Sequence, residues 1–98
     1  MGSEKAFMAI IAELKRAEEK FPGWPDDVVH ASAILNEEAG ELTQAALDYF
    51  YGRYTSTDRM KKEAAQVGAM ALRFLIGLDI AKASTPPSDG ESQKKEMA

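Results

Sequence analysis

The sequence predicts an all-α fold made of three helices. Apolar residues recur at helical spacing in three segments, and each segment is followed by residues that stop helices. No segment shows the alternation of apolar and polar residues that indicates a strand, and no glycine-rich phosphate loop is present. A chain of 98 residues forms one small domain with a thin core. We therefore expect homo-oligomerisation to complete a four-helix-bundle-like core.

The first two helices are expected over residues 4–20 and from residue 25 or 26 to residue 51. The segment FPGWP (residues 21–25) ends the first helix, because a glycine and two prolines cannot continue it. Pro25 suits the first turn of the second helix, and the aspartates that follow complement the positive end of its dipole. Gly52 provides a stop at its other end. The packing face expected for the first helix consists of Phe7, Ile10, Ile11 and Leu14.

The third helix is expected to begin with Thr57 or Asp58 as its N-cap and to end near Lys82, where the segment STPP (residues 84–87) follows. Residues 84–98 consist mainly of serine, proline, lysine and glutamate, a composition typical of disorder. We therefore expect a helical domain over residues 1–83 and a disordered tail over residues 84–98.

The composition excludes several classes of function. A formal net charge of −4 argues against a nucleic acid polymer as partner. The absence of cysteine excludes disulfides, cysteine-ligated zinc and thiol nucleophiles, and it suits a reducing cytoplasm. No apolar run approaches the roughly 20 residues that span a bilayer, so we expect a cytoplasmic protein with no membrane partner.

The stretch NEEAGEL (residues 36–42) carries three glutamates that a helix places in different directions. With about 100° of turn per residue, Glu38 lies in the middle of the apolar stripe of the second helix, Glu41 at its margin and Glu37 further out. A carboxylate directed at a core is costly unless it is paired, protonated or bound to a metal. The stripe consists of Ala31, Ile34, Leu35, Leu42 and Ala45.

The third helix repeats this pattern. Glu63 lies in the middle of its apolar stripe, and Gln66 has the same offset from Glu63 that Glu41 has from Glu38. Packed face to face, the two helices would gather three carboxylates and one amide oxygen. Oxygen ligands of this kind favour Mg²⁺, or Mn²⁺. We therefore predict a metal site made of Glu38, Glu41, Glu63 and Gln66.

Two other interpretations of these acids remain open. In the first, the apolar stripes are rotated from the positions given above and the acids face solvent. In the second, basic side chains neutralise the acids, and the available ones are Arg59, Lys61, Lys62 and Arg73. A di-iron site is disfavoured, because it needs Glu-x-x-His pairs and the only histidine, His30, precedes Glu38 by eight residues.

The motif residues resemble a known family. Glu37-Glu38-Ala39-Gly40-Glu41, followed after residues 42–62 by Glu63-Ala64-Ala65-Gln66, is similar to the motif of the all-α, MazG-like nucleoside triphosphate pyrophosphohydrolases. Their pattern is Glu-Glu-x-x-Glu, a variable spacer and Glu-x-x-Asp. The resemblance covers roughly residues 4 to 82. Gln66 departs from it, because the family has aspartate there, and a neutral ligand is expected to hold the cation more weakly.

The resemblance implies hydrolysis of a nucleoside triphosphate between the α and β phosphates. Glu37 and Glu38 are the expected catalytic residues, with Glu38 also holding Mg²⁺ and Glu37 positioning or deprotonating the attacking water. The side chains expected to hold the outer phosphates are those of Arg53, Arg59, Lys61 and Lys62. Each of them has the alternative of being a solvated surface residue.

Aromatic residues offer candidates for base recognition. Trp24 and His30 are the substrate-binding candidates, with the alternatives that Trp24 is a core anchor and that His30 is a surface residue. The aromatic residues of segment 49–54 either stack on a base or form a dimer contact.

We expect an enzyme that removes unwanted nucleotides as a homodimer or tetramer. One alternative is a non-catalytic helical module, binding metal or protein, whose site is degenerate at Gln66. Another is a dUTPase-like or phosphoribosyl-ATP pyrophosphatase-like enzyme with the same metal site. The sequence leaves open the base and sugar, the number of metal ions and the order of the oligomer.

Overall fold

The computed structural model of the chain describes the backbone of residues 1–84 and the side chains of residues 1–79. Three helices make up this part: α1 (Ser3–Lys20), α2 (Val28–Phe50) and α3 (Asp58–Ser84). Residues 1–84 contain no strand, so the all-α prediction is confirmed. The tail predicted from residue 84 lies, from residue 85 onward, outside the described residues.

Helix α2 begins two or three residues later than predicted. Its N-cap is Asp27, whose side chain accepts a hydrogen bond from the backbone N–H of Val29 at 2.9 Å. Because this carboxylate satisfies a first-turn donor, the helix starts at Val28, and Pro25 stays in the linker. At the other end Gly52 has a φ of 77°, the left-handed conformation that glycine adopts without strain. The predicted stop at Gly52 is therefore confirmed.

The ends of the other helices differ from prediction by one or two residues, which is usual for helix termini. Helix α1 begins at Ser3 rather than at residue 4, and α3 ends at Ser84 rather than at Lys82. Helix α3 begins at Asp58, whose backbone N–H donates to the hydroxyl of Ser56 at 3.1 Å.

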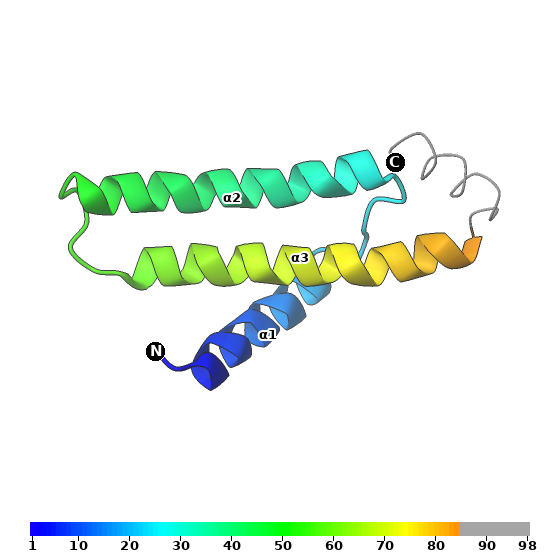
Figure 1. Ribbon diagram of the computed structural model, residues 1–98, viewed down its shortest axis with the longest axis horizontal. Helices are drawn as coiled ribbons and strands as arrows, with labels where there is room; N and C mark the ends of the chain where they lie inside the picture. The colour runs from blue at the N-terminus through cyan, green and yellow to red at the C-terminus, as the bar shows by residue number, and fades with distance from the viewer. Residues whose placement is uncertain (85–98) are drawn as a thin grey trace, which may run out of the picture.

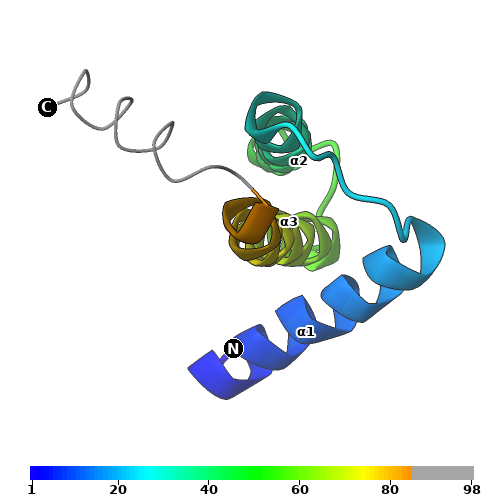
Figure 2. The same cartoon turned by 90° about the vertical axis from the view of Figure 1, so that its right-hand side faces the viewer.

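Helices α2 and α3 lie side by side and antiparallel, joined by the loop of residues 51–57 (Figure 1). Helix α1 crosses α3 at an angle, as Figures 1 and 2 show. Within the described residues α1 and α2 both pack on α3, and no Cα atom of α1 lies within 8 Å of a Cα atom of α2. A Cβ at Gly68 would lie 2.8 Å from Cδ1 of Ile10. The missing side chain at Gly68 therefore allows α1 to approach α3 closely.

The core of the described residues is small. No large side chain among them is fully buried, and Phe7, predicted on the packing face of α1, is 59% exposed. Phe7 stays exposed because α1 packs on one helix only, which covers a narrow strip of its surface. The other three residues of this apolar face are half-buried. The buried apolar side chains are Ala31, Ala45, Ala65, Ala69 and Met70.

None of the described helices combines the length and the apolar character needed to cross a membrane. The cytoplasmic location stays a prediction.

Candidate metal and ligand site

Three carboxylates meet between α2 and α3. Glu38 and Glu41 come from α2 and Glu63 from α3, and one carboxylate oxygen of each lies within 4.8 Å of the others. Glu38 and Glu63 are half-buried, and Glu41 is exposed. The structure thus brings together the three acidic members of the predicted ligand set. We call these three residues the carboxylate cluster.

The cluster holds its negative charges at a cost. Oε2 of Glu38 and Oε2 of Glu63 are buried and accept no hydrogen bond. Burial raises the pKa of Glu38, and the charges of Glu41 and Glu63 raise it further. Burial also raises the pKa of Glu63, and the charge of Glu41 adds to it, while Arg59 opposes this rise. A bound cation would relieve both the burial and the repulsion.

Basic side chains do not neutralise the cluster by direct contact. Among residues 1–79 no lysine or arginine forms an ion pair with Glu38, Glu41 or Glu63. Lys62 acts on Glu63 only through its charge, which lowers the pKa of that glutamate slightly against the larger effect of burial. The interpretation in which basic residues pair with these acids is therefore not supported by the contacts.

A pocket of about 780 Å³ opens beside the cluster. This volume lies within the range of ligand sites, and α1, the linker between α1 and α2, and the other two helices all contribute to its wall. Glu37 is exposed and stands outside the cluster, as its place on the helix predicts. The predicted site residues that line the pocket are Trp24, Glu37, Glu38, Lys62 and Gln66.

Gln66 lines the pocket together with Glu13 of α1. The pKa of Glu13, on α1, is lowered by a hydrogen bond from Arg16 and, to a smaller extent, by one from the side chain of Gln66. An amide has one donor end and one acceptor end. Aspartate at this position would have no such donor and would repel Glu13.

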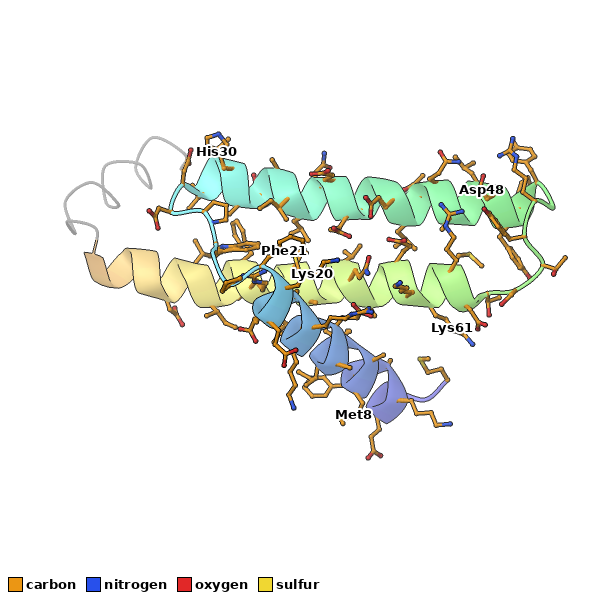
Figure 3. All side chains as sticks on the ribbon, turned by 180° about the vertical axis from the view of Figure 1, so that it is seen from behind. Met8, Lys20, Phe21, His30, Asp48 and Lys61 are labelled. Carbon is orange, nitrogen blue, oxygen red and sulfur yellow. The ribbon has the colours of Figure 1, made fainter. Side chains whose placement is uncertain are left out.

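Other predicted residues lie away from the pocket. Lys61 is exposed and points away from α2, and His30 stands on the outer side of α2 (Figure 3). Nδ1 of His30 lies 2.7 Å from Oδ2 of Asp27, and the histidine side chain is 78% exposed. Arg53 and Arg59 both donate to Asp48, at 2.8 and 2.7 Å.

Sequence reasoning missed four charged residues of the pocket wall. Arg73 follows Gln66 by seven residues, which is about two helical turns. The two residues therefore share a face of the helix, and this spacing could have predicted that Arg73 lies on the same side as the site. The other three lie on one face of α1, but nothing in the sequence shows which helix that face meets. They are Glu13, Arg16 and Lys20.

Comparison of the chain with protein-family models, with curated proteins and with solved structures finds no match. The MazG-like resemblance therefore stays a prediction that depends on residues 37–41 and 63–66. Any functional proposal has to be argued from the cluster and its pocket.

Proposed function

We propose that the protein is a Mg²⁺-dependent nucleoside triphosphate pyrophosphohydrolase, which cleaves its substrate between the α and β phosphates to a monophosphate and pyrophosphate. The observation that carries this proposal is the cluster of three carboxylates, two of which have a buried oxygen without a hydrogen-bond donor, beside a pocket of ligand size. Hard divalent cations prefer oxygen ligands of this kind, and Mg²⁺ commonly binds substrate phosphates through the positions that the protein leaves open. Mn²⁺ suits the same donors.

The residues of the cluster fit a cation by their chemistry. Glu38, Glu41 and Glu63 would hold it, with the amide oxygen of Gln66 as a weaker fourth ligand. When bound, the cation supplies charge neutralisation for the phosphates and acidifies a water molecule. The neutral amide at position 66 is expected to lower the affinity relative to a carboxylate.

The pocket wall supplies the other roles. Glu37 lines the pocket but stands outside the cluster, which suits a base that accepts the proton of the attacking water. Lys62, Arg16 and Lys20 line the same pocket and provide positive charge for the outer phosphates. Trp24 forms part of the wall against which a base would lie.

We also propose that the chain works as a homo-oligomer, a dimer or a tetramer. The described part has no fully buried large side chain, and many large apolar side chains are exposed on it. A second copy packed along α2 would complete a four-helix-bundle-like core. Size-exclusion chromatography with light scattering tests this, and a monomer at micromolar concentration would contradict it. The exposed apolar side chains of α2 include Val28, Val29, Leu47, Tyr49 and Phe50.

The activity is tested with a panel of ribo- and deoxyribonucleoside triphosphates, dUTP included, in the presence of Mg²⁺ and with detection of pyrophosphate. We expect turnover of at least one nucleotide and a loss of at least about 100-fold in Glu38→Gln, an isosteric change that removes the charge. Glu4→Gln, at an exposed position of α1, is the matched control and should keep full activity.

An absence of turnover with every nucleotide and both metals would contradict the hydrolase. It would favour the second candidate, a non-catalytic helical module that binds metal or a protein. The observation in favour of that candidate is Gln66, whose amide replaces the carboxylate of the family motif and which lines the pocket together with Glu13.

A further inference from the structure

Arg73 is a buried cation without an acidic partner in the part of the chain that the structure describes. The residue is 8% exposed, and no ion pair among residues 1–79 involves it. Its Nη2 donates to the backbone carbonyl of Phe21 at 2.7 Å and to that of Gly23 at 3.2 Å. Buried arginines are usually paired with an anion, because an isolated charge is costly to remove from water.

The guanidinium of Arg73 has N–H donors that make no hydrogen bond within the described residues. Both hydrogen bonds come from Nη2, and the N–H groups of Nη1 and Nε make none within residues 1–79. Arg73 lines the 780 Å³ pocket together with Arg16 and Lys20 of α1. The unused donors thus belong to a side chain of the pocket wall.

The orientation of this guanidinium is fixed without any ligand. Its central carbon lies 4.8 Å from the centroid of the Trp24 ring, and the two carbonyls hold its other side. Trp24 in turn lies against the backbone of α3, where a Cβ at Gly77 would come within 2.8 Å of Cδ1 and Nε1 of the indole. A donor group held in place before binding loses little entropy when it binds.

We propose that Arg73 is an anion-binding residue and that, with Arg16 and Lys20, it forms a phosphoryl site in the pocket. Guanidinium groups match the geometry of phosphate oxygens with paired N–H donors. One pocket is then lined both by Glu38, whose Oε2 is buried without a hydrogen-bond partner, and by a guanidinium with unused donors. The identity of the anion as the pyrophosphate end of the substrate rests on the proposed function, whereas the anion site itself does not.

Trp24 reports on this site, because it is the only tryptophan of the chain and stacks on Arg73. The experiment titrates the full chain with inorganic pyrophosphate, without metal, and follows tryptophan emission. We expect a saturable change in the wild type, binding at least about tenfold weaker in Arg73→Gln, and a smaller loss in Arg73→Lys, which keeps the charge but not the paired donors. Lys15→Gln, at an exposed position of α1, is the control for loss of one positive charge and should bind like the wild type.

Circular dichroism shows whether Arg73→Gln keeps its helices after losing the bonds to the linker. If it does not, the wild type supplies the test: the Arg73 Nε–H resonance, assigned by its absence from the Arg73→Lys spectrum, should shift on addition of pyrophosphate. Equal pyrophosphate affinity in a folded Arg73→Gln variant, or an unchanged Nε–H resonance in the wild type, would overturn the anion site. Pyrophosphate binding through Arg73 without turnover of any nucleotide would support this site and contradict the hydrolase.

Discussion

Asp48 and the carboxylate cluster occupy the same interface between α2 and α3 but have opposite surroundings. Oδ1 of Asp48 accepts hydrogen bonds from Gln44 and Arg53, and Oδ2 accepts one from Arg59. One oxygen of Glu38 and one of Glu63 are buried with no donor at all. Seven residues separate Glu41 from Asp48, which is about 10 Å along the helix.

The pKa shifts follow these surroundings. The hydrogen bonds from Arg59 and Arg53 lower the pKa of Asp48. Burial and neighbouring carboxylates raise the pKa values of Glu38 and Glu63. An ionised carboxylate therefore stabilises the fold at Asp48, whereas the ionised carboxylates of the cluster destabilise it.

The comparison separates an acid that is paired within the fold from the acids that we propose bind a cation. The backbone carbonyl of Asp48 also accepts from the N–H groups of Arg53 and Tyr54, at 2.8 and 3.4 Å, so this residue fastens the loop to the end of α2 (Figure 3). The cluster, in contrast, leaves its buried oxygens available to a ligand. Asp48 is surrounded by donors and holds the chain together, whereas the cluster has two buried oxygens without donors, which is the basis for proposing a cation.

The largest effect on stability is expected from Asp48→Asn. The change leaves two arginines without their carboxylate and should lower the Tm by roughly 5–10 °C, with Mg²⁺ affinity at low temperature unchanged. Calorimetry measures the Tm, and Asp26→Asn, at an exposed position of the linker, is the control. A Tm that stays within about 1 °C of wild type would show that Asp48 does not fasten the loop.

Glu38→Gln should shift stability in the opposite direction. In metal-free protein near neutral pH the substitution removes a buried like charge, so we expect the Tm to rise by about 2–4 °C. The control is Glu4→Gln, which should lower the Tm slightly, because a negative charge in the first turn of α1 favours the helix. A fall in Tm would mean that the charge of Glu38 already has a stabilising partner in the metal-free protein.

The dependence of stability on pH distinguishes the cluster from Asp48, because their contributions change in opposite directions as the pH rises. The folded pKa values of Glu38 and Glu63 are raised, so their contribution to stability is complete below the ordinary glutamate value of about 4.3 and is lost as the pH rises through the folded values. The folded pKa of Asp48 is lowered, so its contribution is present above the ordinary aspartate value of about 3.9 and is lost as the pH falls through the folded value.

Thermal unfolding of wild type, Glu38→Gln and Asp48→Asn at a series of pH values measures both effects. The advantage of Glu38→Gln should disappear near about pH 4, and the deficit of Asp48→Asn should shrink only at still lower pH. A difference between Glu38→Gln and wild type that does not change with pH would contradict the raised pKa of Glu38.

Gln66→Asp is expected to have the smallest effect. A fourth carboxylate should tighten Mg²⁺ binding several-fold, and repulsion from Glu13 should limit the gain. Adding Glu13→Gln to this variant should increase the affinity further. An affinity equal to that of the wild type in both variants would show that position 66 does not contribute a ligand.

Helical periodicity was sufficient to predict how α2 and α3 face each other. The apolar stripes fix which side of each helix is buried, and Glu38 and Glu63 lie within those stripes, so their approach follows from about 3.6 residues per turn. The same reasoning placed Glu37 outside the cluster. These conclusions need only local geometry and the burial of apolar side chains.

The partners of the basic residues could not be predicted from helical periodicity, because they depend on how the helices and the linker pack in three dimensions. Arg59 was a candidate for phosphate binding, but the α2–α3 hairpin brings it to Asp48, eleven residues earlier in the chain. Arg73 is fixed by carbonyls of the linker, whose path depends on how α1 crosses α3. Long basic side chains take the partner that the tertiary structure offers, so their roles could not be predicted from spacing alone.

Cation binding by the carboxylate cluster is the central claim, and isothermal titration calorimetry of the metal-free protein with Mg²⁺ tests it most directly. We predict saturable binding to the wild type, a loss of at least about tenfold in affinity in Glu38→Gln and in Glu63→Gln, and unchanged binding in Asp48→Asn. Mn²⁺ should give the same order of variants. If the wild type shows no saturable binding, or if Glu38→Gln and Glu63→Gln bind as tightly as the wild type, the cluster is not a metal site.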